Sequence, residues 1–545
     1  MLRMKKKRLS LGLDLSTQGI SAVVLDIDTR KRVCEHSLDY YRDPRLNVYG
    51  IRKEDYILPP ETEGEASQPP ELFFAALDAM FADLKDAVAL RDIVIINNSG
   101  QQHGHVYLNH QAHSIFHGLS EEDAMRSDLA TMLKGSLAYK LAPIWMTSNT
   151  AEQAEHIRDY VGGQARAILL SGSDIPLRFT GVVMRKIAQQ YPEVYHQTDN
   201  IQLISSLVPA ILTGNSKVPV DYGNACGTSL MDYTQKRWSD VLIKAASDGL
   251  PGGNESFRNR LPSIVAPDTV VGTIAKYFVR KYGFSPVCKV VAGSGDNPQS
   301  KVLVAGDLLS LGTSFVNMVS TDGKTFDMNG FANAMYDGAG RPFMFGCRTN
   351  GAIVWDRLRA MYGLKKEEYR PAEEALRQAP IAQSMVFWQP RKESFPLSGS
   401  VDMVRIGLEK PSLGNDYAGL IETSLAAIYH HSKDFSMATS EPLYVTGGAK
   451  NSPEILRRVA AIWRRQIIPI EEGGAALGAA VIAAGTFFRS RGETINMEQY
   501  ISSGLLKRKQ PFQPGTDDVL AFHRPGGYLE KFAMEEAKLL TRLNG

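Results

Sequence analysis

The chain has few cysteines, no excess of charge and no long apolar run. Its four cysteines among 545 residues are far apart and form no C-x-x-C pair, which argues against a disulfide scaffold or a zinc ribbon and favours free thiols in the cytoplasm. Because 61 Lys and Arg balance 59 Asp and Glu, no global charge attracts nucleic acid. The most apolar segment, 475–488, is shorter than the ~20 residues that cross a bilayer, so we expect no membrane partner.

Several common catalytic motifs are also missing. The chain contains no G-x-x-x-x-G-K-[ST], no G-x-S-x-G elbow, no H-E-x-x-H helix and no G-x-G-x-x-G after a strand. These absences exclude a P-loop enzyme and give no support to a serine hydrolase, a zinc protease or a dinucleotide-binding enzyme.

The length predicts more than one domain, since single cores stop growing at ~250–300 residues. Apolar residues alternate with small or polar ones from residue 9 to 15, and a Ser-Thr-Gln-Gly turn leads into a second strand at 20–27. A third strand at 33–40 completes an antiparallel meander. A similar strand–turn–strand pattern returns at 308–319. We therefore expect two related α/β halves, divided near residue 300.

Other segments fit the same alternation of helices and strands. Apolar residues at helical spacing predict a helix over 73–84, and short apolar runs predict strands at 93–96 and 289–292. Residues 442–449 predict a strand that enters a glycine turn, followed by a helix that opens at Asn451-Ser-Pro.

Two polar turns are candidates for binding phosphate. The turns 14–19 and 312–314 offer backbone N–H groups and hydroxyls, and Asp14 and Asp296 add carboxylates of the kind that Mg²⁺ prefers. This combination suits ATP and Mg²⁺. Asp296 follows a strand, so it is either a general base or the N-cap of a helix.

Histidine is concentrated in one stretch. Five of the eleven histidines lie between His103 and His117. His110, His113 and His117 could face one way on a helix and bind zinc, or form a solvated surface. His103 ends a predicted buried strand, where it could hydrogen-bond a polyol or cap the strand.

The motifs together resemble the FGGY family of carbohydrate kinases, and most of all its xylulose-kinase branch of animal type. The resemblance extends from about residue 9 to about residue 487 and also includes Arg178-Phe-Thr-Gly181. The motifs occur in the family's order: Leu11-Gly-Leu-Asp-Leu-Ser-Thr-Gln-Gly, Ser99-Gly-Gln-Gln-His-Gly104, Gly295-Asp-Asn297, Leu309-Ser-Leu-Gly-Thr-Ser314 and Thr446-Gly-Gly-Ala449.

The resemblance implies an actin-like, hexokinase-like (ribonuclease H-like) α/β fold, with two domains around a deep central cleft. It places sugar binding, the first phosphate turn and the catalytic aspartate in residues 1–300, and the second phosphate turn and the adenosine motif in residues 301–545. The implied reaction is ATP-dependent phosphorylation of the terminal hydroxyl of a ketose, with Mg²⁺, and D-xylulose is the first candidate. We expect a cytoplasmic monomer or homodimer whose partners are the sugar and ATP.

The family's functional residues can be carried over by position. Asp296 matches the catalytic base and Asp14 the acidic residue associated with Mg²⁺. The sugar-binding candidates are Gln102, His103, Arg178, Asp296 and Asn297. The nucleotide-binding candidates are Asp14, Thr17, Gly312, Thr313, Ser314, Tyr369, Gly447, Gly448, Ala449, Asn451 and Ser452.

One departure leaves the sugar open. Many relatives carry an aspartate after the Trp-Met pair, where this chain has Thr147. Another pentulose such as ribulose, or a polyol, is therefore an alternative substrate. A third interpretation is a catalytically inactive protein that senses a sugar or a nucleotide. Glycerol is disfavoured, because glycerol kinases have an Arg-Glu pair in the region of Gln102 and His103.

Overall fold

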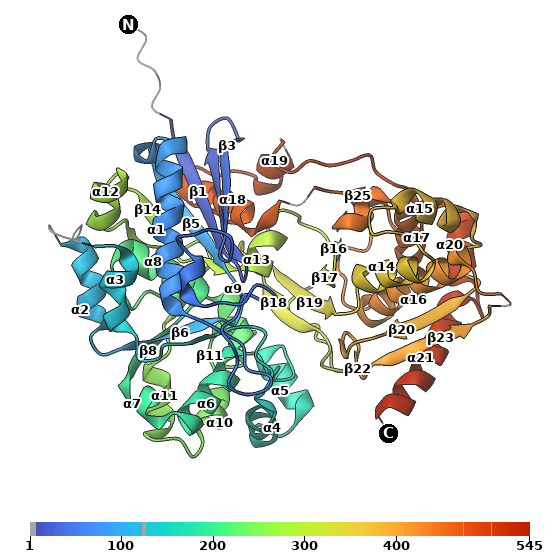
Figure 1. Ribbon diagram of the computed structural model, residues 1–545, viewed down its shortest axis with the longest axis horizontal. Coiled ribbons are helices and arrows are strands. Elements are labelled where there is room, and N and C mark those ends of the chain that lie inside the picture. Colours follow the sequence, from blue (N-terminus) through green and yellow to red (C-terminus); the bar gives the residue numbers. More distant parts are fainter. Residues whose placement is uncertain (1–6, 122–126, 409, 472, 503, 545) are drawn as a thin grey trace, which may run out of the picture. The chain divides into compact units, whose positions relative to one another are not determined.

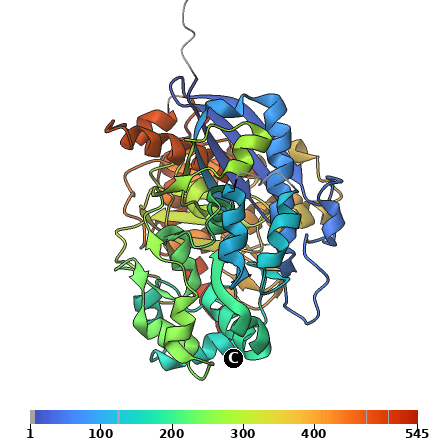
Figure 2. The same ribbon diagram turned by 90° about the vertical axis from the view of Figure 1, so that its left-hand side faces the viewer.

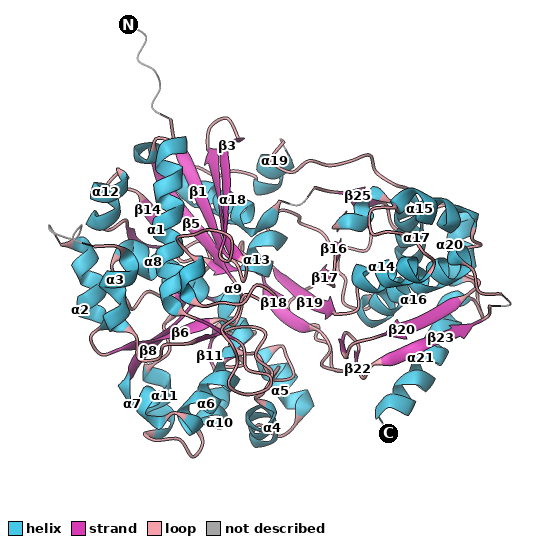
Figure 3. Cartoon of the chain, in the orientation of Figure 1, coloured by secondary structure: helices cyan, strands magenta, loops and turns pink. Residues whose placement is uncertain are grey.

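The computed structural model describes residues 7–121, 127–408, 410–471, 473–502 and 504–544 (Figure 1). The chain forms two compact units, each with a β-sheet and surrounding helices (Figure 3). Unit 1 comprises Met1–Leu303, Ala334–Pro342 and Gly473–Leu505. Unit 2 comprises Val304–Asn333, Phe343–Glu472 and Leu506–Gly545. Each unit therefore contains segments that are distant in the sequence.

The main sheet of unit 1 has the strand order β13-β14-β5-β1-β2-β3, and β15 also pairs with β5. β1 and β2, and then β2 and β3, pair antiparallel, which confirms the predicted meander. β5 lies parallel to β1, β14 and β15. The strands are β1 Leu9–Leu15, β2 Gly19–Asp26, β3 Lys31–Asp39, β5 Ile93–Gly100, β13 Val270–Thr273, β14 Lys289–Val291 and β15 Ser294–Gly295.

Both faces of this sheet are covered by helices. The predicted helix over 73–84 is confirmed as α1 (Pro70–Ala87), which begins with a proline at its first position and buries Phe73, Leu77 and Phe81. α18 (Gly474–Arg489) packs against β1, although it lies far along the chain. Its small residues allow a close approach: a Cβ on Gly12 would lie 2.0 Å from the backbone oxygen of Ala476.

The remaining elements of unit 1 surround the sheet, and Figure 2 views this unit with α1 and α12 toward the reader. The further helices are α2 Ala112–His117, α3 Leu129–Leu133, α4 Ala151–Tyr160, α5 Gln164–Ser171, α6 Thr180–Gln190, α7 Pro192–Gln197, α8 Ile204–Thr213, α9 Tyr222–Ala225, α10 Asp240–Ser247, α11 Gly253–Asn259, α12 Lys276–Tyr282, α13 Asp296–Lys301 and α19 Met497–Ser502. The further strands are β4 Ser67–Gln68, β6 His105–Asn109, β7 Ala142–Pro143, β8 Thr198–Leu203, β9 Val220–Asp221, β10 Met231–Asp232, β11 Arg237–Trp238 and β12 Ile264–Val265.

The sheet of unit 2 contains β19, β17, β16, β24 and β25 in that order. β16 and β17 form the predicted hairpin, and β24 lies parallel to β16 and β25. The strands are β16 Leu308–Leu311, β17 Phe315–Ser320, β19 Pro342–Arg348, β20 Met385–Gln389, β21 Glu393–Ser394, β22 Leu397–Ser398, β23 Val401–Ile406, β24 Leu443–Thr446 and β25 Ile467–Pro469. β18 (Asn333–Tyr336) starts at the last residue of a unit 2 segment and otherwise belongs to unit 1. The helices are α14 Ala352–Met361, α15 Tyr369–Gln378, α16 Leu413–Ser432, α17 Pro453–Trp463, α20 Thr516–His523 and α21 Tyr528–Asn544.

All four cysteines are free thiols. Among the residues that the structure describes, no helix combines the length and the apolar character needed to span a bilayer.

Candidate active site

Two aspartates lie at the carboxyl edge of the unit 1 sheet. Asp14 on β1 is paired with Ser99 on β5, and Ser294 on β15 is paired with the same Ser99 from the other side. Asp296 follows β15 directly and starts α13. Because β1, β5 and β15 run parallel, both carboxylates leave the sheet at the edge where α/β proteins commonly bind their ligands.

Burial makes both carboxyl groups harder to ionise. It raises the pKa of Asp14 to about 6, and the Oδ1 atom of Asp14 is buried without a hydrogen-bond partner among the described residues. Burial, reinforced by the negative charge of Asp14, raises the pKa of Asp296 to about 7. A carboxylate with a pKa near 7 has the protonation balance that suits a general base.

Asp296 is held by its own helix turn. Its Oδ1 accepts hydrogen bonds from the backbone N–H of Asn297 at 2.8 Å and from the Asn297 side chain at 3.1 Å. The same Asn297 amide donates to Oε1 of Gln102 at 2.9 Å. The three predicted sugar-site residues therefore form one hydrogen-bonded group. No side-chain cap bond forms at the start of α13, where Gly295 and not Asp296 is the N-cap residue.

His103 is fixed nearby in an unusual backbone conformation, with φ +67°. Its Nδ1 is 2.8 Å from the carbonyl oxygen of Gly227, and its ring stacks on Phe179 at 4.3 Å. Burial, together with the charge of Arg178, lowers the pKa of His103 to about 3. The imidazole is therefore neutral. Because Nδ1 donates to the carbonyl, Nε2 is left as a hydrogen-bond acceptor.

Thr17, in the first phosphate turn, belongs to a hydrogen-bond network that the sequence did not reveal. Its hydroxyl accepts a bond from Nε1 of Trp145 at 2.8 Å and donates to Oε1 of Gln101 at 3.2 Å. Gln101 in turn donates to Gln68, whose Nε2 donates to the backbone oxygen of Thr17. Trp145 is 45% exposed. No motif in the sequence marks its bond to Thr17, because the two residues lie 128 positions apart.

In unit 2, the second phosphate turn and the glycine motif lie together. Residues 312–314 join β16 to β17, and Thr313 and Ser314 are exposed. Gly447 follows β24 with φ +86°, and a Cβ there would lie 2.5 Å from the backbone oxygen of Leu311 and 2.9 Å from the backbone nitrogen of Gly312. Only glycine suits this conformation and this close approach.

The other nucleotide candidates lie around the start of α17. Gly448, Ala449 and Asn451 belong to a short 3-10 helix at Gly448–Asn451, and Oδ1 of Asn451 accepts a bond from Lys509 at 2.5 Å. Ser452 caps α17 by accepting a bond from the N–H of Ile455, and its hydroxyl donates to Glu373 of α15.

Tyr369 begins the same α15 and is 61% exposed. The Arg359 guanidinium lies over its ring, 4.5 Å from the centroid. The Ser452–Glu373 bond thus joins the helix that carries Tyr369 to the start of α17.

The three spaced histidines do not converge. His110 precedes α2 and is 3.6 Å from Asp199, whereas His117 pairs with Glu121 at 3.0 Å. His113 is exposed. Within the described ranges, these histidines form no common group of metal ligands.

Comparison with known proteins identifies the class. Residues 137–302 match the N-terminal domain, and residues 308–486 the C-terminal domain, of the FGGY family of carbohydrate kinases. The xylulose kinase of Saccharomyces cerevisiae is 30% identical over 427 residues, which cover 76% of this chain and 69% of that protein. The chain belongs to the FGGY family, as its motifs predicted. It is a sugar kinase that acts on a sugar and ATP.

Two further relatives extend over nearly the whole chain. The D-xylulose kinase A of Aspergillus niger is 26% identical over 585 residues, covering 98% of this chain and 99% of that protein. The crystal structure of a xylulose kinase from Rhodospirillum rubrum has a TM-score of 0.78 at 16% identity, covering 98% of this chain and 99% of that one. The predicted actin-like fold of two α/β domains is confirmed.

Proposed function

We propose that the protein transfers the γ-phosphoryl group of ATP to the terminal hydroxyl of D-xylulose and forms D-xylulose 5-phosphate. Full-length relatives that are named as D-xylulose kinases support this substrate. The observation that carries the chemistry is Asp296, which lies at a sheet edge beside Asp14 with its pKa raised to about 7.

Asp296 acts as the general base. Its carboxylate accepts the proton of the sugar hydroxyl as that oxygen attacks phosphorus, a role worth ~10²–10⁴ in rate. Gln102 and Asn297 hold the carboxylate in place through their shared hydrogen bonds. The neutral His103 offers Nε2 to a sugar hydroxyl, and Arg178 contributes donors from the turn before α6.

The residues present fit Mg²⁺ and a nucleotide. The unpartnered carboxylate oxygen of Asp14 is a hard ligand in a buried setting, which suits a divalent cation. When bound, Mg²⁺ neutralises the charge that develops on the phosphoryl oxygens. In unit 1, Thr17 offers a hydroxyl of the kind that binds phosphate. In unit 2, the turn 312–314 offers N–H groups and the exposed hydroxyls of Thr313 and Ser314.

The adenosine group would occupy the region of 447–452 and Tyr369. Gly447 allows its turn to approach the backbone of Gly312, so one surface of unit 2 carries both nucleotide motifs. Sugar binding then belongs to the predicted domain 1–300 and nucleotide binding to the predicted domain 301–545.

Thr147, which stands where many relatives have an aspartate, makes a structural contact in this chain. Its side chain is only 5% exposed, and its hydroxyl donates to the backbone oxygen of Ala66 at 3.0 Å. The Thr147 hydroxyl therefore secures the loop around it, and the substrate panel described next tests whether the departure from many relatives changes the sugar.

The test is ADP release by the purified full chain with MgATP and a panel of pentuloses, hexuloses, polyols and glycerol. We expect the highest kcat/KM with D-xylulose. A highest kcat/KM with ribulose or a polyol would support the same phosphoryl transfer but with that compound as the substrate. ATP binding without turnover on any sugar would favour the sensor reading.

The remaining expectations are part of the same proposal. The four free cysteines support a cytoplasmic location, and the near balance of charge supports the absence of a nucleic-acid partner. We expect no membrane partner and a monomer or homodimer, which light scattering on a sizing column would measure.

A further inference from the structure

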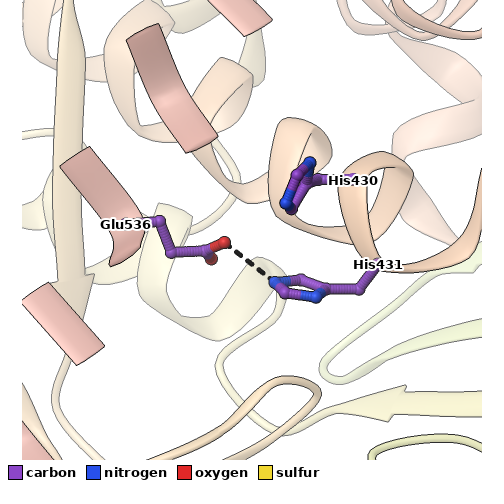
Figure 4. Close-up of side chains that lie close together, drawn as sticks. All are labelled: His430, His431 and Glu536. Atoms are coloured by element: carbon purple, nitrogen blue, oxygen red, sulfur yellow. Dashed lines mark hydrogen bonds and ion pairs between the residues drawn. The ribbon is translucent and has the colours of Figure 1, made fainter. Parts of the chain in front are cut away.

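Two histidines and a glutamate that have no role in the site described above gather in unit 2. His430 and His431 lie in the last turn of α16, and Glu536 lies on the C-terminal helix α21 (Figure 4). One ligand atom from each residue lies within 4.8 Å of the other two. Nε2 of His431 is 2.8 Å from a carboxylate oxygen of Glu536.

The surroundings of this group are largely apolar. The ring edges of Phe331 and Phe395 flank His431, with centroid distances of 5.6 and 6.0 Å. Phe532, one turn before Glu536 on α21, lies against the ring of His430 at 6.2 Å. An apolar shell restricts water and strengthens electrostatic bonds inside it.

The two imidazoles and the carboxylate of this group are side chains that suit a cation. Glu536 is only 5% exposed, and a buried carboxylate needs a positive partner. Among the described residues, none hydrogen-bonds to the His430 ring, so the ring nitrogens are available within that part of the chain.

We propose that His430, His431 and Glu536 bind a divalent transition-metal ion of the zinc class, which fastens α21 to α16. Zinc takes imidazole and carboxylate ligands at about 2.0–2.2 Å, so tetrahedral donors lie about 3.3 Å apart. The present separations, from 2.8 Å to at most 4.8 Å, bracket that value. Small side-chain rotations therefore suffice, and water would take the fourth position.

The experiment measures metal binding by the full chain. The purified protein is stripped with a chelator, the chelator is removed, and zinc is titrated at pH 7.5 against a chromophoric competitor. Cobalt(II) is added to a second sample, because its visible absorption reports four-coordinate geometry. The variants are Glu536→Gln, which keeps the side-chain shape, and His430→Asn. The control is His113→Asn, an exposed histidine of α2.

We expect the wild-type chain and His113→Asn to bind one zinc ion more than either cluster variant, with at least a 100-fold loss of affinity in the variants. The four-coordinate cobalt spectrum should vanish in the same two variants, and zinc should raise the melting temperature of the wild type and of His113→Asn but not of either cluster variant. Equal zinc binding by wild type and His430→Asn would overturn the proposal and leave a plain His431–Glu536 ion pair. Circular dichroism checks the fold, and His430→Asn decides the question should Glu536→Gln not fold.

Discussion

Replacing Asp296 by asparagine should stabilise the ligand-free protein while removing its activity. The asparagine keeps an Oδ1 that can accept the 2.8 Å bond from the N–H of Asn297, so the local geometry is retained. What disappears is a negative charge that the fold holds in a partly buried place beside Asp14. The variant therefore separates the electrostatic cost of the site from its structure.

The magnitude follows from the two ionisation states. The pKa of Asp296 is about 7 in the folded protein, against a usual value of 3.8. At 1.36 kcal/mol for each pH unit, the difference corresponds to about 4 kcal/mol above pH 7. Since the side chain is only partly buried, screening by water reduces this to ~2 kcal/mol.

The pH dependence shows whether ionisation of Asp296 stabilises or destabilises the folded protein. Below pH 3.8 the carboxyl group is protonated in both the folded and the unfolded chain, so it costs nothing. As the pH rises toward 7, the unfolded chain ionises first and the wild type loses stability. Asp296→Asn should therefore match the wild type near pH 4 and exceed it at pH 8.

Thermal unfolding without ligands, followed from pH 4 to pH 8.5, measures this difference. We expect a gain of about 2–4 °C for Asp296→Asn at pH 8 that shrinks as the pH falls. Asp322→Asn is the matched control, because backbone N–H groups of Lys324 and Thr325 lower the pKa of that carboxyl group. It should lose stability at pH 8. An Asp296→Asn protein that melts at or below the wild-type temperature at pH 8 would refute the reasoning.

Three further outcomes are expected. Gly12→Ala places a Cβ 2.0 Å from the Ala476 oxygen, so the α18–sheet contact should lose at least ~3 kcal/mol, measured by denaturant unfolding. Gly447→Ala imposes φ +86° on alanine and a 2.5 Å approach to the Leu311 oxygen; KM for ATP should rise at least tenfold, with KM for the sugar unchanged. The wild-type kcat/KM for the sugar should fall about tenfold per pH unit below about pH 7, because Asp296 must be ionised to accept a proton; a flat profile from pH 8 to pH 5.5 would count against it.

The spacing of apolar residues predicted those helices and strands whose contacts are with residues close in the sequence. The alternation at 9–15 and the polar turn after it led to the antiparallel β1–β2 pair, because each strand buries its leucines and isoleucines against neighbours close in sequence. The apolar spacing at 73–84 predicted α1 for the same reason.

Contacts between distant segments were not predictable in this way. Nothing in the composition of α18 shows that it packs on Gly12, more than 460 residues earlier, or that it belongs to unit 1. The sequence predicted two domains divided once, near residue 300. The compact units each combine separate segments, and Ala334–Pro342 and Gly473–Leu505 belong to unit 1 together with the first 303 residues. Likewise, the bond from Trp145 to Thr17 joins loops 128 residues apart and became visible only in three dimensions.

The candidate site shows the same limit. Motifs placed Asp14 and Asp296 in the chain, but their common sheet edge depends on β5, which pairs with both β1 and β15. Ser452 shows that a matched position can also have a structural task, since its hydroxyl caps α17 and binds Glu373.

The most direct test of the central claim compares D-xylulose-dependent ADP release by the wild type and Asp296→Asn, with sugar binding measured by calorimetry. The account predicts turnover by the wild type, a loss of at least ~100-fold in the variant, and retained sugar binding in both. Near-wild-type turnover by Asp296→Asn would contradict it, as would a wild type that binds ATP and D-xylulose but releases no ADP.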